Sequence, residues 1–464
     1  MRTAVADEAA DRRREQRGWY FYDWACSVYS TSVLTVFLGP YLTSVAEEAA
    51  DAEGFVHPLG IPVRAGSFFA YSVSLSVIVA VLVMPLVGAA ADRSGRKKPF
   101  LGAAAYVGAG ATAGMFFLAG DRYLLGGVLL IVANAAQSVA MMLYNSYLPQ
   151  IAPPEERDAV SSRGWAFGYA AGALVLVANL VLYLAHDSFG LSEGMAVRIC
   201  LASAGLWWGG FALIPLRRLR DRGTRARETT TPAREASTPA PETATPAPEA
   251  TAPGLRQLAA TVRDMRRHPL TLGFLLAYLV YNDGIQTVIS QASIYGSKEL
   301  DLGQSTLIGA VLLVQVLAVA GALALGRLAR SYGAKRTILG SLAAWTAVLA
   351  AGYFLPAGQP VWFFVLASGI GLVLGGSQAL SRSLFSHLVP PGKEAEYFAA
   401  YEVSDRGMSW LGPLLFGLTF QLTGSYRDAI ISLVAFFVLG FVLLARVPVR
   451  RAIGDAGNPV PERI

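Results

Sequence analysis

Ionisable side chains inside long apolar runs are the residues of this chain best placed to do chemistry. Asp283 lies ~20 Å along the apolar run 269–295, at the 1.5 Å rise of a helical residue, and so near the middle of a bilayer. A carboxylate at that depth cannot extend to water, and burying its charge is costly unless it is paired, protonated or hydrated. We expect Asp283 to act in substrate or proton binding. The alternative is a structural hydrogen bond to a neighbouring helix.

Neutral amide side chains occur at comparable depths and are candidates for the same pathway. Asn282 and Gln286 lie close to Asp283 in the sequence, and Gln286 shares its helix face because residues three apart are neighbours. The other members of this set are Asn134, Gln137, Asn179 and Gln378. Each amide could contact a polar solute or join two helices, and the sequence favours neither.

A second group of ionisable residues lies nearer to the ends of the apolar runs. It contains three acids and three bases: Asp23, Arg163, Arg382, Glu402, Asp405 and Arg406. Because these residues come from both halves of the chain, salt bridges among them could form a cytoplasmic gate that opens when the halves rock apart. The alternative is that each side chain extends along its own helix to the water at the membrane surface.

The sequence has no motif typical of a metal, phosphate-binding or soluble catalytic site. Its four histidines (His57, His186, His268 and His387) are scattered, and no glycine-rich phosphate loop occurs. We therefore expect no metal, no cofactor and no enzymatic activity.

The apolar runs themselves predict an all-α integral membrane protein. The chain has 464 residues, of which 54% are hydrophobic and 15% charged. A helix of about 20 apolar residues spans the ~30 Å of a bilayer core. We predict twelve such helices at 19–44, 66–91, 99–119, 122–152, 162–185, 196–215, 269–295, 303–326, 336–355, 360–388, 397–423 and 426–446.

These spans divide the chain into two halves. We predict an N-terminal six-helix bundle (19–216) and a C-terminal six-helix bundle (269–446). The connecting segment 217–268 contains a Thr-Pro-Ala-Pro-Glu tract that cannot bury apolar surface, so we expect a largely disordered cytoplasmic linker. The segments 1–18 and 447–464 are predicted tails.

The distribution of positive charge predicts the orientation. With both termini inside, only Arg64, Arg122, Arg198, Lys298 and Arg427 of the 38 lysines and arginines lie outside. Because lysine and arginine concentrate in cytoplasmic loops, we expect both termini on the cytoplasmic side of the plasma membrane. The net charge of +6 follows from this sorting by loop and does not indicate nucleic-acid binding.

A short polar turn joins the second and third predicted helices at 88–98. Gly88 would allow another backbone to approach closely, and Gly95 suits a turn that needs positive φ. Asp92 ends a helix whose dipole opposes its charge, so we expect it to contact a base or the N-terminus of another helix. The basic residues of the turn are Arg93, Arg96, Lys97 and Lys98. The second half repeats the pattern at 326–336, with Arg330 in place of Asp92.

The pattern Gly-x-x-x-Asp-Arg-x-Gly-Arg-Lys at 88–97 resembles the loop between helices 2 and 3 of the major facilitator superfamily. The stretches 22–27, 281–287 and 375–383 are similar to the autophagy-related vacuolar effluxer family and its bacterial "unknown major facilitator" branch. The resemblance implies twelve helices in two pseudo-symmetric six-helix bundles. It also implies that Asp92 contacts helix eleven near Glu396 to Tyr401, and that the cargo is an amino acid, as in fungal relatives.

We therefore expect a monomeric transporter that moves a small solute across the bilayer by alternating access, coupled to protons. Efflux of an amino acid or related metabolite is the favoured function. Transport of a lipid or lysolipid, or of a sugar or drug-like solute, remains open. A membrane sensor or a membrane-embedded enzyme is the remote alternative, because the chain offers no folded signalling segment and no clear catalytic cluster.

Overall fold

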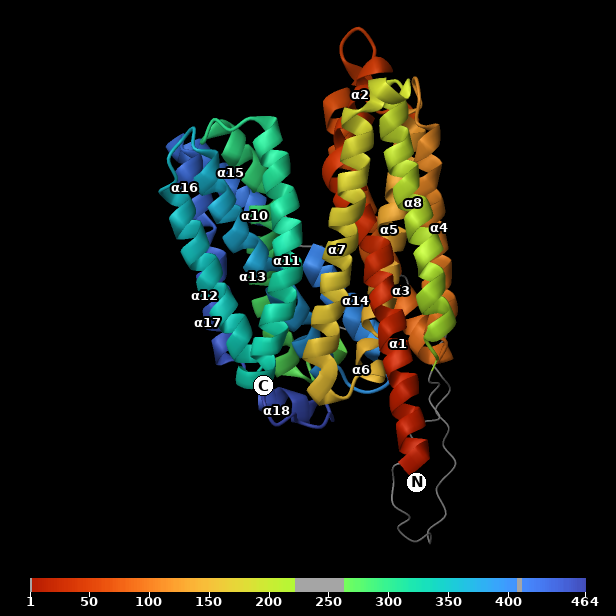
Figure 1. The fold of residues 1–464 in the computed structure, drawn as a ribbon, viewed down its shortest axis with the longest axis vertical. Coiled ribbons are helices and arrows are strands. Elements are labelled where there is room, and N and C mark those ends of the chain that lie inside the picture. The colour runs from red at the N-terminus through yellow and green to blue at the C-terminus, as the bar shows by residue number, and fades with distance from the viewer. Residues whose placement is uncertain (1, 222–262, 407–410) are drawn as a thin grey trace.

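The computed structural model describes residues 2–221, 263–406 and 411–464, and these residues form an almost entirely helical protein (Figure 1). The predicted all-α fold is confirmed. The described exception is a short antiparallel hairpin of β1 (Phe55–Val56) and β2 (Val63–Arg64) in the connection between α2 and α3. Most of the predicted linker, 222–262, lies outside the described residues.

The first bundle begins with one long continuous helix. It consists of α1 (Arg2–Val28), the π-helical segment η1 (Tyr29–Phe37) and α2 (Leu38–Glu48). The remaining long helices are α3 (Phe68–Ser94), α4 (Lys97–Gly114), α5 (Tyr123–Asn145), α7 (Arg157–Leu184) and α8 (Glu193–Arg218). The short elements are η2 (Pro58–Gly60), η3 (Ala65–Ser67), η4 (Met115–Phe117), α6 (Leu148–Ile151), η5 (Pro154–Glu156) and η6 (His186–Phe189).

The second bundle repeats this arrangement. Its helices are α10 (Pro269–Lys298), α11 (Gln304–Tyr332), α12 (Ala334–Tyr353), α13 (Pro360–His387), α14 (Glu394–Arg406), α15 (Leu411–Thr423), α16 (Tyr426–Ser432) and α17 (Val434–Arg446). A short last helix, α18 (Val449–Asp455), lies under the bundle (Figure 1).

Each predicted span coincides with one helix or with two or three consecutive helical segments. Within the described residues, ten helices are long and apolar enough to cross a membrane. The two remaining spans of the predicted twelve correspond to α12 and to the pair α14 and α15. The main difference is at the N-terminus, where α1 begins at Arg2, so that the predicted tail 1–18 continues the first helix.

The outer surface of the bundles carries large apolar side chains. Leu184, Leu206 and Leu422 are 76%, 70% and 84% exposed. Contiguous apolar surface of this kind is unfavourable in water, whereas in a bilayer it contacts lipid chains. The helical backbone satisfies its own hydrogen bonds, which spanning a membrane requires.

The two bundles stand side by side, and both chain termini lie at the same end of the molecule (Figure 1). We call this end the terminus end. The α6–α7 and α14 regions bring the bundles together there, while the ribbons separate toward the opposite end (Figure 1). The hairpin of β1 and β2 lies at that opposite end.

Candidate functional site

A single buried arginine of the second bundle forms the centre of the contact between the bundles. Arg382, five residues before the end of α13, is 1% exposed. Its Nε donates to Ser161 Oγ at 2.9 Å and its Nη2 to the Ser161 carbonyl oxygen at 2.8 Å. Its Nη1 donates to Asp23 Oδ2 at 3.3 Å and to Asn145 Oδ1 at 3.2 Å. All of these acceptors belong to the first bundle, so the guanidinium ties one bundle to the other.

Aromatic rings of the first bundle complete the pocket around this guanidinium. Its carbon Cζ lies 4.7 Å from the ring centroid of Trp19, 5.4 Å from Trp165 and 5.6 Å from Tyr144. Tyr144 donates its hydroxyl to Asp23 Oδ2 at 2.6 Å and stacks on Trp19 at 4.3 Å. Ring faces and one carboxylate both attract a cation, so the first bundle presents a site matched to Arg382.

Further hydrogen bonds join the bundles around this pocket. Asn145 donates its amide to Glu402 Oε1 of α14 at 2.8 Å. Ser161 donates to the Ala379 carbonyl oxygen at 2.6 Å. Two longer bonds lie nearer the middle of the helices: Tyr169 to Gln378 at 3.1 Å, and Gln315 to Thr31 of the π-helical segment at 3.1 Å.

The 88–98 turn forms a second contact, closer to the terminus end. Asp92 Oδ2 accepts a hydrogen bond from the Glu396 amide in the first turn of α14 at 3.0 Å, which confirms the expected contact with a helix N-terminus. Lys97 Nζ lies 3.3 Å from Asp92 Oδ1 and 3.0 Å from Glu394 Oε2. A Cβ on Gly88 would lie 3.0 Å from the Ala395 carbonyl oxygen, which is a tight contact, so the glycine favours this close approach.

The turn itself has the conformation that the sequence predicts. Gly95 follows α3 with a φ of 64°, in the left-handed region that favours glycine. Arg93 and Arg96 are exposed on this turn, whereas Lys97 is buried.

The corresponding contact on the other side of the molecule uses different groups. Ser383 donates to Asp158 Oδ1 in the first turn of α7 at 2.6 Å, and Arg157 Nη1 donates to the Ser386 carbonyl oxygen at 2.9 Å. A Cβ on Gly326 would overlap Ser162, so α11 and α7 also meet closely here. Arg330, which replaces Asp92 in the repeated motif, has no ion pair within the described residues.

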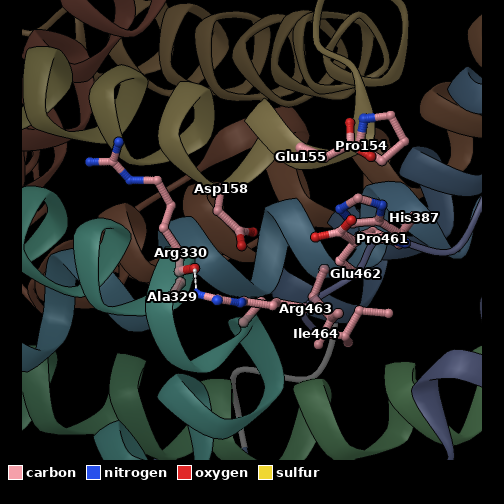
Figure 2. A pocket seen from close by; sticks show the side chains of 12 residues that line it. Pro154, Glu155, Asp158, Ala329, Arg330, His387, Pro461, Glu462, Arg463 and Ile464 are labelled. Atoms are coloured by element: carbon pink, nitrogen blue, oxygen red, sulfur yellow. Dashed lines mark hydrogen bonds between the residues drawn. The ribbon is translucent and has the colours of Figure 1, made fainter.

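A cavity of about 310 Å³ with both polar and apolar lining residues opens between these elements at the terminus end (Figure 2). The first bundle contributes Glu155 and Asp158, and the second contributes Arg330 and His387. The segment 461–464 forms another part of the wall, where Arg463 Nη1 donates to the Arg330 carbonyl oxygen at 3.3 Å. The cavity therefore lies on the terminus side of the Arg382 pocket.

Asp283, the predicted membrane-embedded acid, lies inside the second bundle. It is 2% exposed, and its Oδ2 accepts a hydrogen bond from the Gly412 amide near the start of α15 at 2.8 Å. Its Oδ1 is buried with no hydrogen-bond partner in the described part of the chain. The neighbouring Asn282 points elsewhere and donates to Asp405 Oδ1 at 2.7 Å.

The other predicted amides are distributed over both bundles. Asn134 donates to Ser76 at 2.6 Å, and Gln137 to Ser30 at 3.2 Å, both within the first bundle. Ser203 donates to Asn179 Oδ1 at 3.1 Å. Gln378 takes part in a bond between bundles, as described above. Gln286 is half-buried, and no hydrogen bond joins its side chain to another described residue.

The predicted layer of six charged residues is assembled only in part. Asp23, Arg382 and Glu402 take part in contacts between the bundles. Asp405 accepts from Tyr278 at 2.7 Å and from Asn282, within the second bundle. Arg163 is exposed on the outer surface and is not part of this layer. The Arg406 side chain lies outside the described residues.

The groups that bind Arg382 were not predicted from the sequence. Trp19, Tyr144 and Trp165 are hard to distinguish from core aromatics in an apolar run, and Asn145 and Ser161 are ordinary polar residues near helix ends. One feature of the sequence could have indicated them. Asn145 and Ser161 lie on either side of the Pro153-Pro154 pair between two predicted helices, at the same depth as the predicted charged layer.

The hydrogen bonds and ion pairs that join the bundles in the described part of the chain lie toward the terminus end. Among the described residues, no hydrogen bond or ion pair joins the bundles beyond the level of Thr31 and Gln315, toward the end opposite the termini. Within the described residues, polar contacts thus close the bundles against each other at the terminus end.

Comparisons with known proteins agree with this architecture. The family described as "Vacuole effluxer Atg22 like" matches residues 11–457. The chain is 29% identical to the uncharacterized MFS-type transporter YxiO of Bacillus subtilis, over 94% of this chain and 95% of that protein. It is 26% identical to autophagy-related protein 22 of Coccidioides immitis, over 97% of this chain and 89% of that protein.

Solved structures show the same fold. The Escherichia coli fucose:proton symporter FucP superimposes with a TM-score of 0.65 at 12% identity, covering 94% of this chain and 97% of that one. The proton:xylose symporter XylE gives a TM-score of 0.65 at 15% identity, covering 94% and 95%. The expected family resemblance is thereby confirmed, and these relatives are transporters, not enzymes. The chain is a multi-pass integral membrane transporter of the major facilitator superfamily, and it belongs to the Atg22-like vacuole effluxer family.

Proposed function

We propose that this transporter exports an amino acid or a related metabolite by proton-coupled alternating access, with both termini in the cytoplasm. The observation that carries the alternating-access proposal is the one-sided closure of the bundles around Arg382. With the terminus end in the cytoplasm, these contacts close the bundles on the cytoplasmic side. The export cycle then requires the Arg382 pocket to open toward the cytoplasm, so that the solute can enter from inside.

The charge distribution supports this orientation. Lysine and arginine are concentrated on the loops at the terminus end, as in cytoplasmic loops generally. The end of α2 and the connection to α3 instead contain Glu47, Glu48, Asp51 and Glu53.

The role of Asp283 as the coupling group is also a proposal. One carboxylate oxygen has the Gly412 amide as its partner, and the other has none among the described residues. A neutral carboxylic acid tolerates such a site better than a carboxylate does, because an unpaired buried charge is far more costly than an unpaired polar group. Proton exchange at Asp283 therefore requires movement of α10 relative to α15, which would link protonation to the position of the helices.

The proposed cargo rests on the family, whose description names a vacuole effluxer. Purified protein in proteoliposomes should exchange external labelled amino acid for internal unlabelled amino acid. A panel with the twenty amino acids, several hexoses and a lysophospholipid tests the cargo class in one assay. Exchange of a hexose or a lysophospholipid but of no amino acid would contradict the proposed cargo and leave alternating access intact.

The orientation predicts which positions an impermeant thiol reagent can label in intact cells. Cys26 and Cys200 are buried and can be replaced first. Ser192→Cys, exposed at the start of α8, should then label from outside, whereas Asp455→Cys, exposed at the end of α18, should label only after permeabilisation. The opposite labelling pattern would reverse the orientation.

The Arg382 pocket predicts strong coupling between Arg382 and Asp23. Either Arg382→Gln or Asp23→Asn leaves a buried partner uncompensated, a change that typically costs about 3–5 kcal/mol, whereas the double variant removes both charges. We therefore expect each single variant to lower transport and thermal stability more than the double variant does.

The two single variants and the double variant form a double-mutant cycle. Its matched control is Arg427→Gln, because Arg427 pairs with Glu299 at 2.8 Å within the second bundle. Arg427→Gln should combine additively with Asp23→Asn. Additive losses for Arg382→Gln and Asp23→Asn as well would show that the two residues act independently.

The coupling proposal predicts that Asp283→Asn separates exchange from accumulation. The amide keeps an acceptor for the Gly412 amide but cannot release a proton. The variant should still exchange labelled for unlabelled solute, while a pH gradient should no longer drive accumulation. If Asp283→Asn concentrates solute with a pH gradient alone, the proton is carried elsewhere, and Asp23 is the next candidate.

A further inference from the structure

A narrow crevice lies on the outer surface where α1, α7 and α11 meet. Its volume is about 210 Å³, and its wall is almost wholly apolar. The apolar lining residues are Trp24, Ala166, Phe167, Ala170, Val319 and Leu323. Since α1 and α7 belong to the first bundle and α11 to the second, the crevice lies across the boundary between the bundles.

The one charged residue that lines the crevice is Arg163. It lies six residues into α7, about 9 Å from the terminus end of that helix. Its side chain is exposed, and it has no ion pair within the described residues. It lies near the Tyr20 hydroxyl, as does Glu156. That acid already has two partners: Arg12 at 3.6 Å and Gln16, which donates to it at 2.9 Å.

Other cationic and donor groups surround the same spot. Arg17, exposed on α1, also lies near Tyr20. Arg327 is exposed on α11, one helical turn beyond the lining residue Leu323 and toward the terminus end. The indole N–H of Trp24 has no acceptor among the described residues. The crevice is therefore positive at its terminus side and apolar toward the middle of the helices.

We propose that this crevice binds one anionic phospholipid, with its phosphate on Arg163 and an acyl chain along the apolar wall. A guanidinium binds phosphate through two parallel hydrogen bonds, and Arg17 and Arg327 add attraction for a net negative headgroup. An acyl chain lying against the wall covers its apolar side chains and buries no polar group. A free anion would leave the wall unfilled, so the distribution of polarity fits an amphiphile.

The location of the crevice gives the lipid a mechanical role. Just beyond it, Gly326 of α11 packs against Ser162 of α7, so both walls are held together only while the terminus end is closed. Parting of α7 from α11 would separate Val319 and Leu323 from Phe167 and Ala170. A lipid that contacts both walls binds the closed arrangement and stabilises it by mass action.

The test uses the purified full chain and two lipids, dioleoyl phosphatidylglycerol and dioleoyl phosphatidylcholine. The protein is analysed by native mass spectrometry in an equimolar mixture of the two lipids. It should retain one phosphatidylglycerol molecule per chain at activation energies that remove all other bound lipid molecules. Arg163→Gln should reduce this retained fraction about tenfold. Ala170→Trp, which fills the crevice but keeps Arg163, should reduce it similarly. Added phosphatidylglycerol should raise the thermal midpoint of the native chain and of neither variant.

Arg336→Gln is the matched control, because Arg336 is exposed at the same end on α12, away from the crevice. It should retain phosphatidylglycerol as the native chain does. Midpoints measured in phosphatidylcholine establish that both crevice variants are folded. Unchanged retention in both Arg163→Gln and Ala170→Trp would overturn the proposal, as would equal retention of the two lipids by the native chain. A midpoint shift produced equally by inorganic phosphate would assign Arg163 to a free anion.

Discussion

The closed end of this transporter depends on the burial of one guanidinium. Arg382 comes from α13, yet every hydrogen bond recorded for its side chain is accepted by the first bundle. A buried cation without partners is strongly destabilising, so the second bundle cannot keep Arg382 in place by itself. The buried position of the Arg382 guanidinium is therefore stable only while the first bundle presents Asp23, Asn145 and Ser161 to it.

The two contacts that flank this arginine are unequal. On the α3–α14 side, Asp92, Lys97 and Glu394 form a buried network of charges in contact with a helix N-terminus. On the α7–α11 side, the repeated motif has Arg330 in place of Asp92, and the bundles are joined by Ser383 to Asp158 and by glycine packing. Among the described residues, the α7–α11 side has no such network of buried charges. Less electrostatic free energy therefore opposes separation of the bundles on this side. The crevice proposed to hold a lipid lies on this same side.

Most of the fold could be predicted from the sequence. The length of an apolar run predicts a membrane span, the charge of a loop predicts its side of the membrane, and both are local properties of the chain. The contact of Asp92 with α14 followed from the helix dipole and the family pattern, and Asp23 and Arg382 were placed in one layer by counting residues. Arg163 was not predictable in the same way. Successive side chains of an α-helix differ by about 100° in direction. Ser162 therefore faces the other bundle, whereas Arg163, the next residue, faces outward.

Asp283 shows a related limit. Depth along α10 follows from the sequence, but the partner of the carboxylate does not. The Gly412 amide reaches Asp283 because α15 packs against α10, although the two residues are 129 positions apart in the chain. A sequence of apolar residues does not reveal that packing.

A polar gate also explains how two states can have similar free energies. Apolar side chains packed at the Arg382 position could close the bundles as firmly, since replacing a buried ion pair by apolar residues is often neutral or stabilising. Opening such a gate would expose apolar surface to water at about 25 cal/mol per Å². Opening the actual gate also exposes aromatic rings, but it releases a guanidinium, a carboxylate and an amide, which regain hydration as they part. The loss of buried hydrogen bonds is thus offset by solvation, and the equilibrium stays close enough to balance for a solute or a proton to shift it.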